Sequence, residues 1–472
     1  MIKLMIIASL VLLISITSSK VLYRFGVPML LIFIVLGMLF GSDGIVGIYF
    51  SDYELTKEIS SIALVIIMFF GGFGTNWSMA KPSALPSILM STLGVIITAA
   101  LTGLFSHFVL GTALLEGLLI GAVVASTDAA SVFAILRSQK LNLKGSLAPL
   151  LEVESGSNDP FAYMATLSIL LLMDNNGVSA LFPIVTKQIV FGLLVGTLLA
   201  KFTIHFIKHL RFEIKGFYSI FVLAIAILSY SLSEYLGGNG YLSVYMSGII
   251  LGNSNYLPHK KSAFQFFDCI SWIMQIVLFF MLGLLSFPSK IFSIIGIAVS
   301  ISIFMILVAR PVATFLTLFP FKYSFKEKVF ISWVGLRGAA SIVFAIYATT
   351  YGVDMKYDIF HIVFFVALFS VSIQGSLLPK AAQKLGLVDD NTLVLKTFND
   401  YEGEIDRKLI EVIITSDSKL VNKSIADADI SDDILIVMIK RKGKTILPKG
   451  TTIIQNGDIL IVTGENIESM SL

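Results

Sequence analysis

The chain has 472 residues, of which 56% are hydrophobic and only 14% are charged, and its formal net charge is +3. Soluble globular domains carry about a quarter of charged residues, so this composition excludes an ordinary soluble protein and indicates a polytopic membrane protein. The small net charge gives no reason to expect a nucleic-acid partner, and the single cysteine, Cys269, excludes an intrachain disulfide.

Apolar segments fill most of residues 1–388. A helix needs about 20 apolar residues to cross a bilayer. Residues 2–19 lack a small-residue cleavage site, so we expect a retained membrane helix rather than a removed leader. The sequence predicts about thirteen spanning helices, near 2–19, 26–41, 58–75, 84–109, 113–136, 146–173, 178–207, 216–236, 240–254, 264–286, 291–319, 327–349 and 358–379.

Positive residues in the gaps predict the orientation. If the N-terminus lies outside, the cytoplasmic gaps hold sixteen Lys and Arg residues and the outer gaps hold five, as the positive-inside rule requires. The sixteen are Lys20, Arg24, Lys81, Arg137, Lys140, Lys144, Lys208, Arg211, Lys215, Lys260, Lys261, Lys322, Lys326, Lys328, Lys380 and Lys384; the five are Lys3, Lys57, Lys187, Lys290 and Lys356. We therefore expect a multi-pass cell-membrane protein, surrounded by lipid, with a cytoplasmic C-terminus.

Residues 391–472 have a different character. The segments 408–415, 434–440 and 458–463 are short, β-branched and separated by Gly, Asp and Asn, which is typical of strands. Ser424-Ile-Ala-Asp is expected to open a short helix between the first two. This stretch predicts a small α+β cytoplasmic domain, and a core of this size is marginal enough that we expect dimerisation.

Ionisable residues inside a membrane are costly and therefore mark function. The fifth segment contains Thr127 and Asp128 among Ala and Ser residues, which indicates either close helix packing or an unwound stretch that faces a cavity. In an unwound stretch Thr127 offers oxygens to a cation, and Asp128 balances an exposed helix N-terminus. The alternative is a structural Asp128 that neighbouring backbone satisfies.

The sixth segment is the most polar. Glu154 and Asn158 are four residues apart, as are Ser155 and Asp159, so each pair shares a helix face. Ser155 and Asp159 supply hard oxygen ligands for Na⁺ or K⁺. A carboxylate removed from water favours its protonated form, so a proton and a cation can compete for Asp159. The alternative is a kink at Pro160 that carries satisfied polar groups.

The twelfth segment contains Arg337. Its guanidinium stays protonated and, if buried, requires a carboxylate, for which Glu154 and Asp128 are the candidates. Snorkelling to an interface is the alternative, and it fits a mid-segment position poorly. Arg310, before Pro311, lies nearer the cytoplasmic end of its segment, where we expect it to snorkel.

Together these motifs resemble the NhaP-type branch of the cation:proton antiporter superfamily. The matching residues are Thr127-Asp128, Glu154-Ser155 with Asn158-Asp159, and Gly335-Leu-Arg-Gly338. The resemblance covers about residues 1–388. It implies a homodimer and a fold of inverted repeats, in which two discontinuous helices cross beside the ion site and one bundle moves for alternating access.

The resemblance also implies residue roles. Asp159 becomes the carboxylate that binds the monovalent cation and the proton, with Ser155 and Thr127 as further ligands, and Asn158 holds the crossing helices. An Asn-Asp pair resembles the electroneutral, one-for-one exchangers of this family.

Glu154 and Arg337 are expected to form a buried ion pair, with Asp128 as a second structural carboxylate. One departure concerns the third span, where many relatives place an acidic residue before Gly-Gly and this chain has Phe70 before Gly71-Gly72.

The tail separately resembles the C-terminal half of the regulator of K⁺ conductance module, the TrkA-C domain. The matching stretches are 430–441, Leu447-Pro-Lys-Gly450 and 456–462. On an exchanger, such a domain is similar to that of K⁺/H⁺ antiporters of the CvrA type. It implies either a regulatory dimer cleft for a small ligand such as cyclic di-AMP or a passive dimerisation module; no other cofactor is expected.

These observations predict a K⁺/H⁺ antiporter, with K⁺ favoured by the tail. A Na⁺(Li⁺)/H⁺ antiporter is the alternative within this class. A regulated cation channel is the alternative from another class, but the sequence contains no Thr-Val-Gly-Tyr-Gly-like filter. An enzyme is not expected, because no nucleophile and base pair lies at membrane depth.

Overall fold

The computed structural model describes residues 2–22, 29–139, 141–174, 177–209, 212–353, 355–389, 410–416, 418, 420–428, 430, 434–441 and 444–464. The contacts divide the chain into two compact units, Met1–Asp390 and Asn391–Leu472. Several positions used above lie outside the described residues: Arg24, residues 26–28 of the second predicted span, Lys140, Arg211, and 391–409 at the start of the tail.

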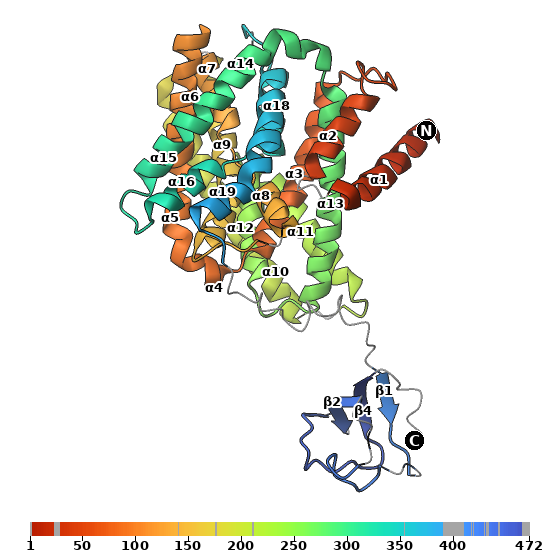
Figure 1. Cartoon of the computed structure of the whole chain (residues 1–472). Helices are drawn as coiled ribbons and strands as arrows, with labels where there is room; N and C mark the ends of the chain where they lie inside the picture. The colour runs from red at the N-terminus through yellow and green to blue at the C-terminus, as the bar shows by residue number, and fades with distance from the viewer. Residues whose placement is uncertain are drawn as a thin grey trace. The chain divides into compact units, whose positions relative to one another are not determined.

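The first unit is helical (Figure 1). Its helices are α1 (Ile2–Leu22), α2 (Met29–Phe40), α3 (Tyr53–Gly74), α4 (Trp77–Ala80), α5 (Ala84–Leu89), α6 (Val95–Leu110), α7 (Leu114–Val124), α8 (Ala129–Ser138), α9 (Leu147–Met173), α10 (Leu181–His209), α11 (Gly216–Tyr235), α12 (Gly240–Gly252), α13 (Lys260–Leu285), α14 (Ile291–Phe304), α15 (Arg310–Thr317), α16 (Phe325–Trp333), α17 (Ala339–Thr350), α18 (Ile359–Phe369) and α19 (Ser376–Leu385). Short π-helical stretches join α5 to α6, α14 to α15 and α18 to α19 without a break.

Every predicted apolar segment coincides with one helix or with consecutive helices. Within the described residues, 8 helical stretches are long and apolar enough to cross a membrane. Shorter apolar helices add to these, among them Met29–Phe40, Gly240–Gly252 and Ala339–Thr350. The chain is thus a multi-pass membrane protein, while the number of thirteen spans stays a prediction.

The helices fall into two groups. The first group is α1–α3 with α10–α13, where α3 packs on α12 and α13, and α2 packs on α13. The second group is α4–α9 with α14–α19, and it consists of two sets of three segments. In each set the middle helix is interrupted, at 125–128 between α7 and α8, and at 334–338 between α16 and α17.

The two interrupted helices run in opposite directions. The helix before the first break, α7, packs against α17, which follows the second break, whereas α8 and α16 both contact α19. This arrangement confirms the expected inverted repeats with two crossing discontinuous helices.

By contrast, α9 continues through Pro160 without a break. Its Pro160 carbonyl accepts a hydrogen bond from the side-chain amide of Asn239 on α12, at 2.9 Å. Asn239 also caps the start of α12 by accepting the Leu242 N–H at 3.0 Å. The sixth predicted segment is thus not unwound at Pro160, and these bonds join α9 to the start of α12.

The second unit is a four-stranded antiparallel sheet of order β1-β4-β2-β3 (Figure 1). Its strands are β1 (Ile410–Ile413), β2 (Ile434–Arg441), β3 (Lys444–Ile446) and β4 (Ile459–Gly464). The predicted strands 434–440 and 458–463 are confirmed, and β1 lies within 408–415. Fully buried Ile439, Ile454, Leu460 and Val462 form the centre of the core.

The helix expected to open at Ser424 is absent from the described residues, which show a turn there. The N–H groups of Ile425 and Ala426 donate to the carbonyls of Thr452 and Gly450, at 3.0 and 2.9 Å. Because these bonds tie the segment to the 450–454 stretch, its backbone is satisfied without a helix.

Candidate functional site

The two helix breaks meet inside the second group of helices. The backbone N–H of Asp128, in the first break, donates to the carbonyl of Leu336, in the second, at 2.8 Å. Gly338 allows this close approach, because a Cβ built on it would lie only 2.5 Å from the Cβ of Asp128. The crossing therefore places Asp128 beside the N-termini of both α8 and α17.

Asp128 is the N-cap of α8. Its carboxylate accepts hydrogen bonds from the Ser131 N–H, at 3.2 Å, and from the Ser131 hydroxyl. A negative charge is favourable at a helix N-terminus. Asp128 therefore balances the exposed N-terminus of α8, as expected for an unwound stretch.

Arg337 lies at the opposite kind of helix end. Its side chain is 3% exposed, and one guanidinium nitrogen donates to the carbonyls of Ala125 and Ser126, at 2.8 and 2.9 Å. These carbonyls belong to the C-terminal end of α7, where a positive charge is favourable. Arg337 thus caps a broken helix.

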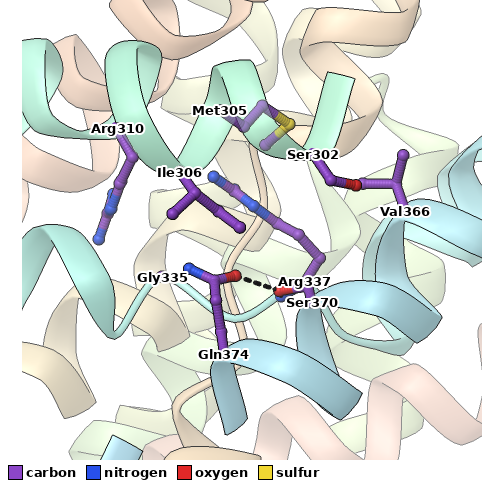
Figure 2. A pocket seen from close by; sticks show the side chains of 9 residues that line it. All are labelled: Ser302, Met305, Ile306, Arg310, Gly335, Arg337, Val366, Ser370 and Gln374. Carbon is purple, nitrogen blue, oxygen red and sulfur yellow. Dashed lines mark hydrogen bonds between the residues drawn. The ribbon is translucent and has the colours of Figure 1, made fainter. Parts of the chain in front are cut away.

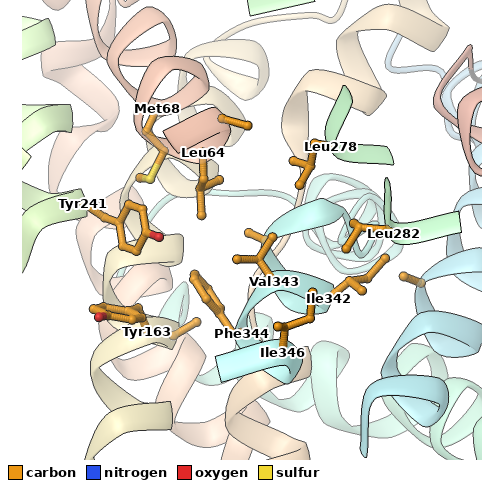
Figure 3. Close-up of a cluster of buried hydrophobic side chains, with 14 of the residues drawn as sticks. Leu64, Met68, Tyr163, Tyr241, Leu278, Leu282, Ile342, Val343, Phe344 and Ile346 are labelled. Carbon is orange, nitrogen blue, oxygen red and sulfur yellow. The ribbon is translucent and has the colours of Figure 1, made fainter. Parts of the chain in front are cut away.

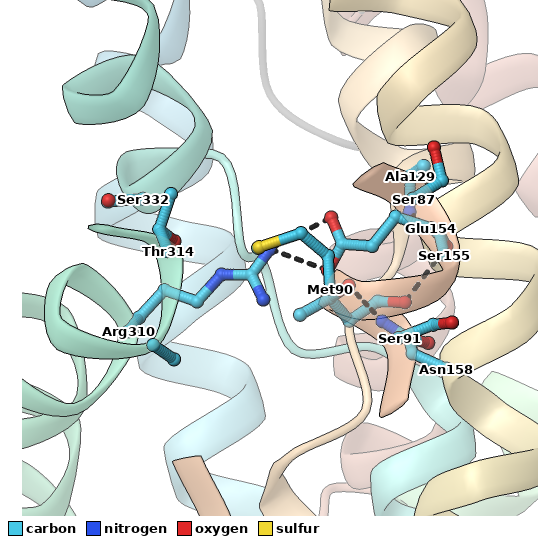
Figure 4. Close-up of polar contacts among 12 residues, drawn as sticks. Ser87, Met90, Ser91, Ala129, Glu154, Ser155, Asn158, Arg310, Thr314 and Ser332 are labelled. Carbon is cyan, nitrogen blue, oxygen red and sulfur yellow. Dashed lines mark hydrogen bonds and ion pairs between the residues drawn. The ribbon is translucent and has the colours of Figure 1, made fainter. Parts of the chain in front are cut away.

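The predicted Glu154–Arg337 ion pair is wrong, because Arg310 takes its place. One guanidinium nitrogen of Arg310 donates to both carboxylate oxygens of Glu154, at 2.7 and 2.9 Å (Figure 4). Arg310 is 3% and Glu154 is 1% exposed. The expected snorkelling of Arg310 is therefore also wrong: a carboxylate on α9 satisfies its charge inside the protein, and α7 carbonyls satisfy that of Arg337.

A small cavity separates the two arginines, between Met305, Arg310, Arg337, Ser370 and Gln374 (Figure 2). Along its wall the backbone N–H of Arg337 donates to the Ser370 hydroxyl at 3.1 Å, and that hydroxyl donates to the Gln374 side-chain carbonyl at 2.7 Å. The Gln374 amide in turn donates to the Trp333 carbonyl at 3.1 Å, at the end of α16. Ser370 and Gln374, which lie between α18 and α19, thus provide hydrogen-bond partners for backbone groups of Arg337 and Trp333 at the second break.

Ser155 and Asn158 fasten the first break to α9. The Ser155 hydroxyl donates to the Thr127 carbonyl and accepts the Ala129 N–H, both at 2.9 Å. The side-chain amide of fully buried Asn158 donates to the Thr127 hydroxyl, and its carbonyl oxygen has no hydrogen-bond partner among the described residues. The oxygens of Thr127, Ser155 and Asn158 therefore gather beside the unwound 125–128 stretch.

Asp159 completes this cluster. Its carboxylate accepts a hydrogen bond from the Ser126 hydroxyl, and it pairs with no Lys or Arg within the described part of the chain. The side chain is partly exposed, whereas the neighbouring Asn158 is fully buried. Within the described residues, Asp159 is thus a partly buried carboxylate without a permanent counter-charge, among hard oxygen ligands.

Access to Asp159 is blocked on one side. One helical turn beyond it, toward the Met173 end of α9, Tyr163 packs against Tyr241 of α12 and Phe344 of α17, with ring centroids 5.0 and 5.7 Å apart (Figure 3). Leu64 and Met68 of α3 lie in the same buried cluster. The cluster seals the two helix groups against each other on that side.

The opposite side of Asp159 is more open. Toward the Leu147 end of α9, Ser155, Gly156 and Ser157 are partly exposed and Glu152 is exposed. On α3, Phe70 stands at the position discussed above and packs its ring on Phe264, with centroids 5.2 Å apart. Phe70 therefore adds an aromatic contact there instead of a carboxylate.

Sequence reasoning missed Ser126 and Ser370 as partners in the site. Ser126 directly precedes the Thr127-Asp128 motif, so its position within an unwound stretch was the available signal. Ser370 carried none, since only the fold brings it to Arg337.

Comparisons with known proteins agree with this geometry. Residues 7–384 match the family model "Sodium/hydrogen exchanger, transmembrane", and residues 409–467 match the TrkA-C domain. The K(+)/H(+) antiporter NhaP2 of Shewanella sp. (strain MR-4) is 34% identical over 475 residues, covering 99% of this chain and 82% of the relative. The Na(+)/H(+) antiporter ApNhaP of Aphanothece halophytica is 27% identical over 389 residues, covering 77% of this chain and 71% of the relative.

Among solved structures, the sodium proton antiporter MjNhaP1 from Methanocaldococcus jannaschii at pH 8 superposes with a TM-score of 0.70 at 26% identity, covering 79% of this chain and 99% of that one. These relatives are transporters, not enzymes. The chain therefore belongs to the sodium/hydrogen exchanger family and is an NhaP-type cation:proton antiporter with a TrkA-C domain.

Proposed function

We propose that this antiporter exchanges one K⁺ for one H⁺ at Asp159, by alternating access. The observation that carries the proposal is the contrast among three carboxylates of the site. Glu154 is paired with Arg310 and Asp128 caps α8, whereas Asp159 is partly exposed and, within the described residues, has only a neutral hydroxyl partner. A carboxylate in that position can alternate between a proton and a cation.

The neighbour of Asp159 supports a one-for-one exchange. Asn158 is neutral in either state of the site and donates to Thr127. A single carboxylate that takes either one H⁺ or one K⁺ carries the same net charge through the membrane in both directions. The exchange is therefore electroneutral. Ser155, Thr127 and the free Asn158 carbonyl are the further oxygens for the cation.

The choice of K⁺ over Na⁺ rests on the relatives. The K(+)/H(+) antiporter aligns over 99% of this chain, tail included, whereas the Na(+)/H(+) antiporter aligns over 77%. Na⁺ is the second candidate, because ApNhaP and MjNhaP1 bear that activity in their names.

The distribution of Lys and Arg supports an orientation with the N-terminus outside and the TrkA-C unit in the cytoplasm. The Leu147 end of α9 then faces the cytoplasm, and the aromatic cluster of Tyr163, Tyr241 and Phe344 closes the outer side. We therefore assign the structure to an inward-facing state. We further propose that the protein is a homodimer in the cell membrane. The tail is proposed to regulate exchange by binding a small ligand such as a cyclic dinucleotide.

The test uses purified full-length protein in proteoliposomes that contain a pH-sensitive dye. K⁺, Na⁺ and Li⁺ are added in turn without a membrane potential. K⁺ should release protons most effectively, and Asp159→Asn should abolish the response to all three. Exchange that persists in Asp159→Asn would show that the site is wrong, and many ions passing per opening in planar bilayers would support a channel instead.

A further inference from the structure

A buried tyrosine lies on the open side of Asp159. Tyr245 of α12 is 4% exposed, and the hydroxyl end of its ring lies against Gly156 of α9. A Cβ at position 156 would be only 2.4 Å from the ring carbon Cε2 and 2.7 Å from the hydroxyl oxygen. Because Gly156 has no side chain, α9 has a notch at this position, and the Tyr245 phenol occupies it.

That notch lies between two carboxylates. Glu152, Gly156 and Asp159 are spaced by four and three residues, so they share one face of α9. Glu152 is exposed at the Leu147 end, and Asp159 lies at the crossing of the broken helices. Seven residues of helix separate these carboxylates by about 10 Å, too far for one ion to contact both.

The Tyr245 hydroxyl has no hydrogen-bond partner within the described residues. The hydroxyls of Thr75 and Ser157 approach it without the geometry of a hydrogen bond. The charges of Glu152 and Asp159 also act on it, and the Thr75 hydroxyl itself donates to Glu152 at 3.4 Å. Buried hydroxyls are normally paired. This unpaired one points at the stretch of α9 that connects an exposed carboxylate to the ion site.

We infer that the Tyr245 hydroxyl is a contact point for the transported cation between Glu152 and Asp159. Glu152 attracts the hydrated cation at the mouth, the phenol oxygen replaces one of its waters, and Asp159 receives it. The inference rests on the proposed function of Asp159. The notch at Gly156 and the contact of the ring with Gly72, whose Cβ would lie 3.2 Å from ring carbon Cδ2, hold the phenol in place.

The experiment compares the parent with Tyr245→Phe, Glu152→Gln and the double variant in the dye-loaded proteoliposomes. Tyr245→Phe keeps the ring in its notch and removes one oxygen. The apparent KM for the cation, added to the face where Glu152 is exposed, should rise about fivefold, as for one neutral hydrogen bond, with little change in maximal rate. In the double variant the rise should be smaller than the product of the two single effects.

Tyr218→Phe is the matched control. Tyr218 of α11 is also buried, at 5% exposure, but its hydroxyl accepts the Phe212 N–H at 3.1 Å. Its loss should lower thermal stability and leave the KM unchanged. A Tyr245→Phe variant with the KM of the parent, or with only a lower maximal rate, overturns the inference alone. A parent without cation-dependent proton exchange overturns the proposed function, and the inference with it.

Discussion

A single guanidinium nitrogen of Arg310 lies 2.7 and 2.9 Å from the two carboxylate oxygens of Glu154, although 156 residues separate them in the chain. Both side chains are buried. Removal of one partner of such a pair leaves an uncompensated charge, which typically costs about 3–5 kcal/mol, whereas an apolar replacement of both is often neutral.

We therefore expect Glu154→Ala and Arg310→Ala to lower the melting temperature of the purified protein strongly. The double variant Glu154→Leu with Arg310→Met should recover most of this loss. The measurement is unfolding followed by intrinsic fluorescence in one detergent. If the double variant is as unstable as the sum of the single ones, the pair is not the source of the stability.

This ion pair also shows where sequence reasoning reaches its limit. The cost of a buried charge predicts that Arg337, if buried, needs a carboxylate, for which Glu154 and Asp128 were the candidates. The identity of each partner depends on which helix ends meet. The carbonyls at the end of α7 already carry partial negative charge, so Arg337 goes to them and Arg310 is left for Glu154. A linear sequence does not display that competition.

The apolar segments were easier to predict, because span length and polarity are properties of the sequence itself. All predicted apolar segments coincide with helices. The stretch around Thr127 and Asp128, for which the sequence left close helix packing or unwinding open, is unwound. Pro160 was a weaker guide, because α9 runs through it without a break.

Gly338 allows the two helix breaks to cross. An added Cβ would lie 2.5 Å from Cβ and 2.6 Å from a carboxylate oxygen of Asp128. Gly338→Ala must therefore displace the cap of α8, and overpacking of this kind costs about 1–3 kcal/mol. We expect a large loss of exchange rate together with a lower melting temperature. The control is Gly296→Ala on α14, which meets open space and should behave like the parent.

A second glycine pair tests the packing of α3 on α12. A Cβ at Gly72 would lie 2.5 Å from the Tyr245 carbonyl oxygen, whereas one at the adjacent Gly71 meets nothing within 4 Å. Small residues allow membrane helices to approach this closely. Gly72→Ala should lower the melting temperature, and Gly71→Ala should leave it unchanged or raise it slightly, because alanine favours helix. A Gly72→Ala variant whose melting temperature equals that of Gly71→Ala would show that α3 and α12 do not need this close approach.

The TrkA-C unit contains its own charge pair, between a buried carboxylate and a partly exposed guanidinium. The guanidinium of Arg441 on β2 donates to both oxygens of Asp458, each at 2.7 Å, and the Gln455 N–H donates to the same carboxylate at 2.8 Å. These bonds, Arg441 first, hold the pKa of Asp458 below its usual range against the opposing effect of burial. Ionised Asp458 is therefore part of the folded sheet.

The sign of the pH dependence follows from that direction. An unfolded Asp titrates at about pH 3.9, so the folded form binds its proton only at lower pH. The contribution of Asp458 to stability is then complete above about pH 5 and disappears as the pH falls through its lowered pKa. Asp458→Asn should destabilise the sheet at pH 7 by about 1.5–3 kcal/mol, the range for hydrogen bonds to charged groups.

Hydrogen exchange of the full-length protein, read by mass spectrometry on peptides from β2 and β4, measures this effect. With intrinsic rates corrected, the difference in protection between Asp458→Asn and the parent should stay constant from pH 8 to pH 5 and shrink only at lower pH. Arg441→Ala should reproduce the loss at pH 7, since it leaves the fully buried Asp458 carboxylate without its guanidinium. A difference that already declines between pH 7 and pH 5 would mean that the folded pKa of Asp458 is raised, which the contacts with Arg441 and Gln455 oppose.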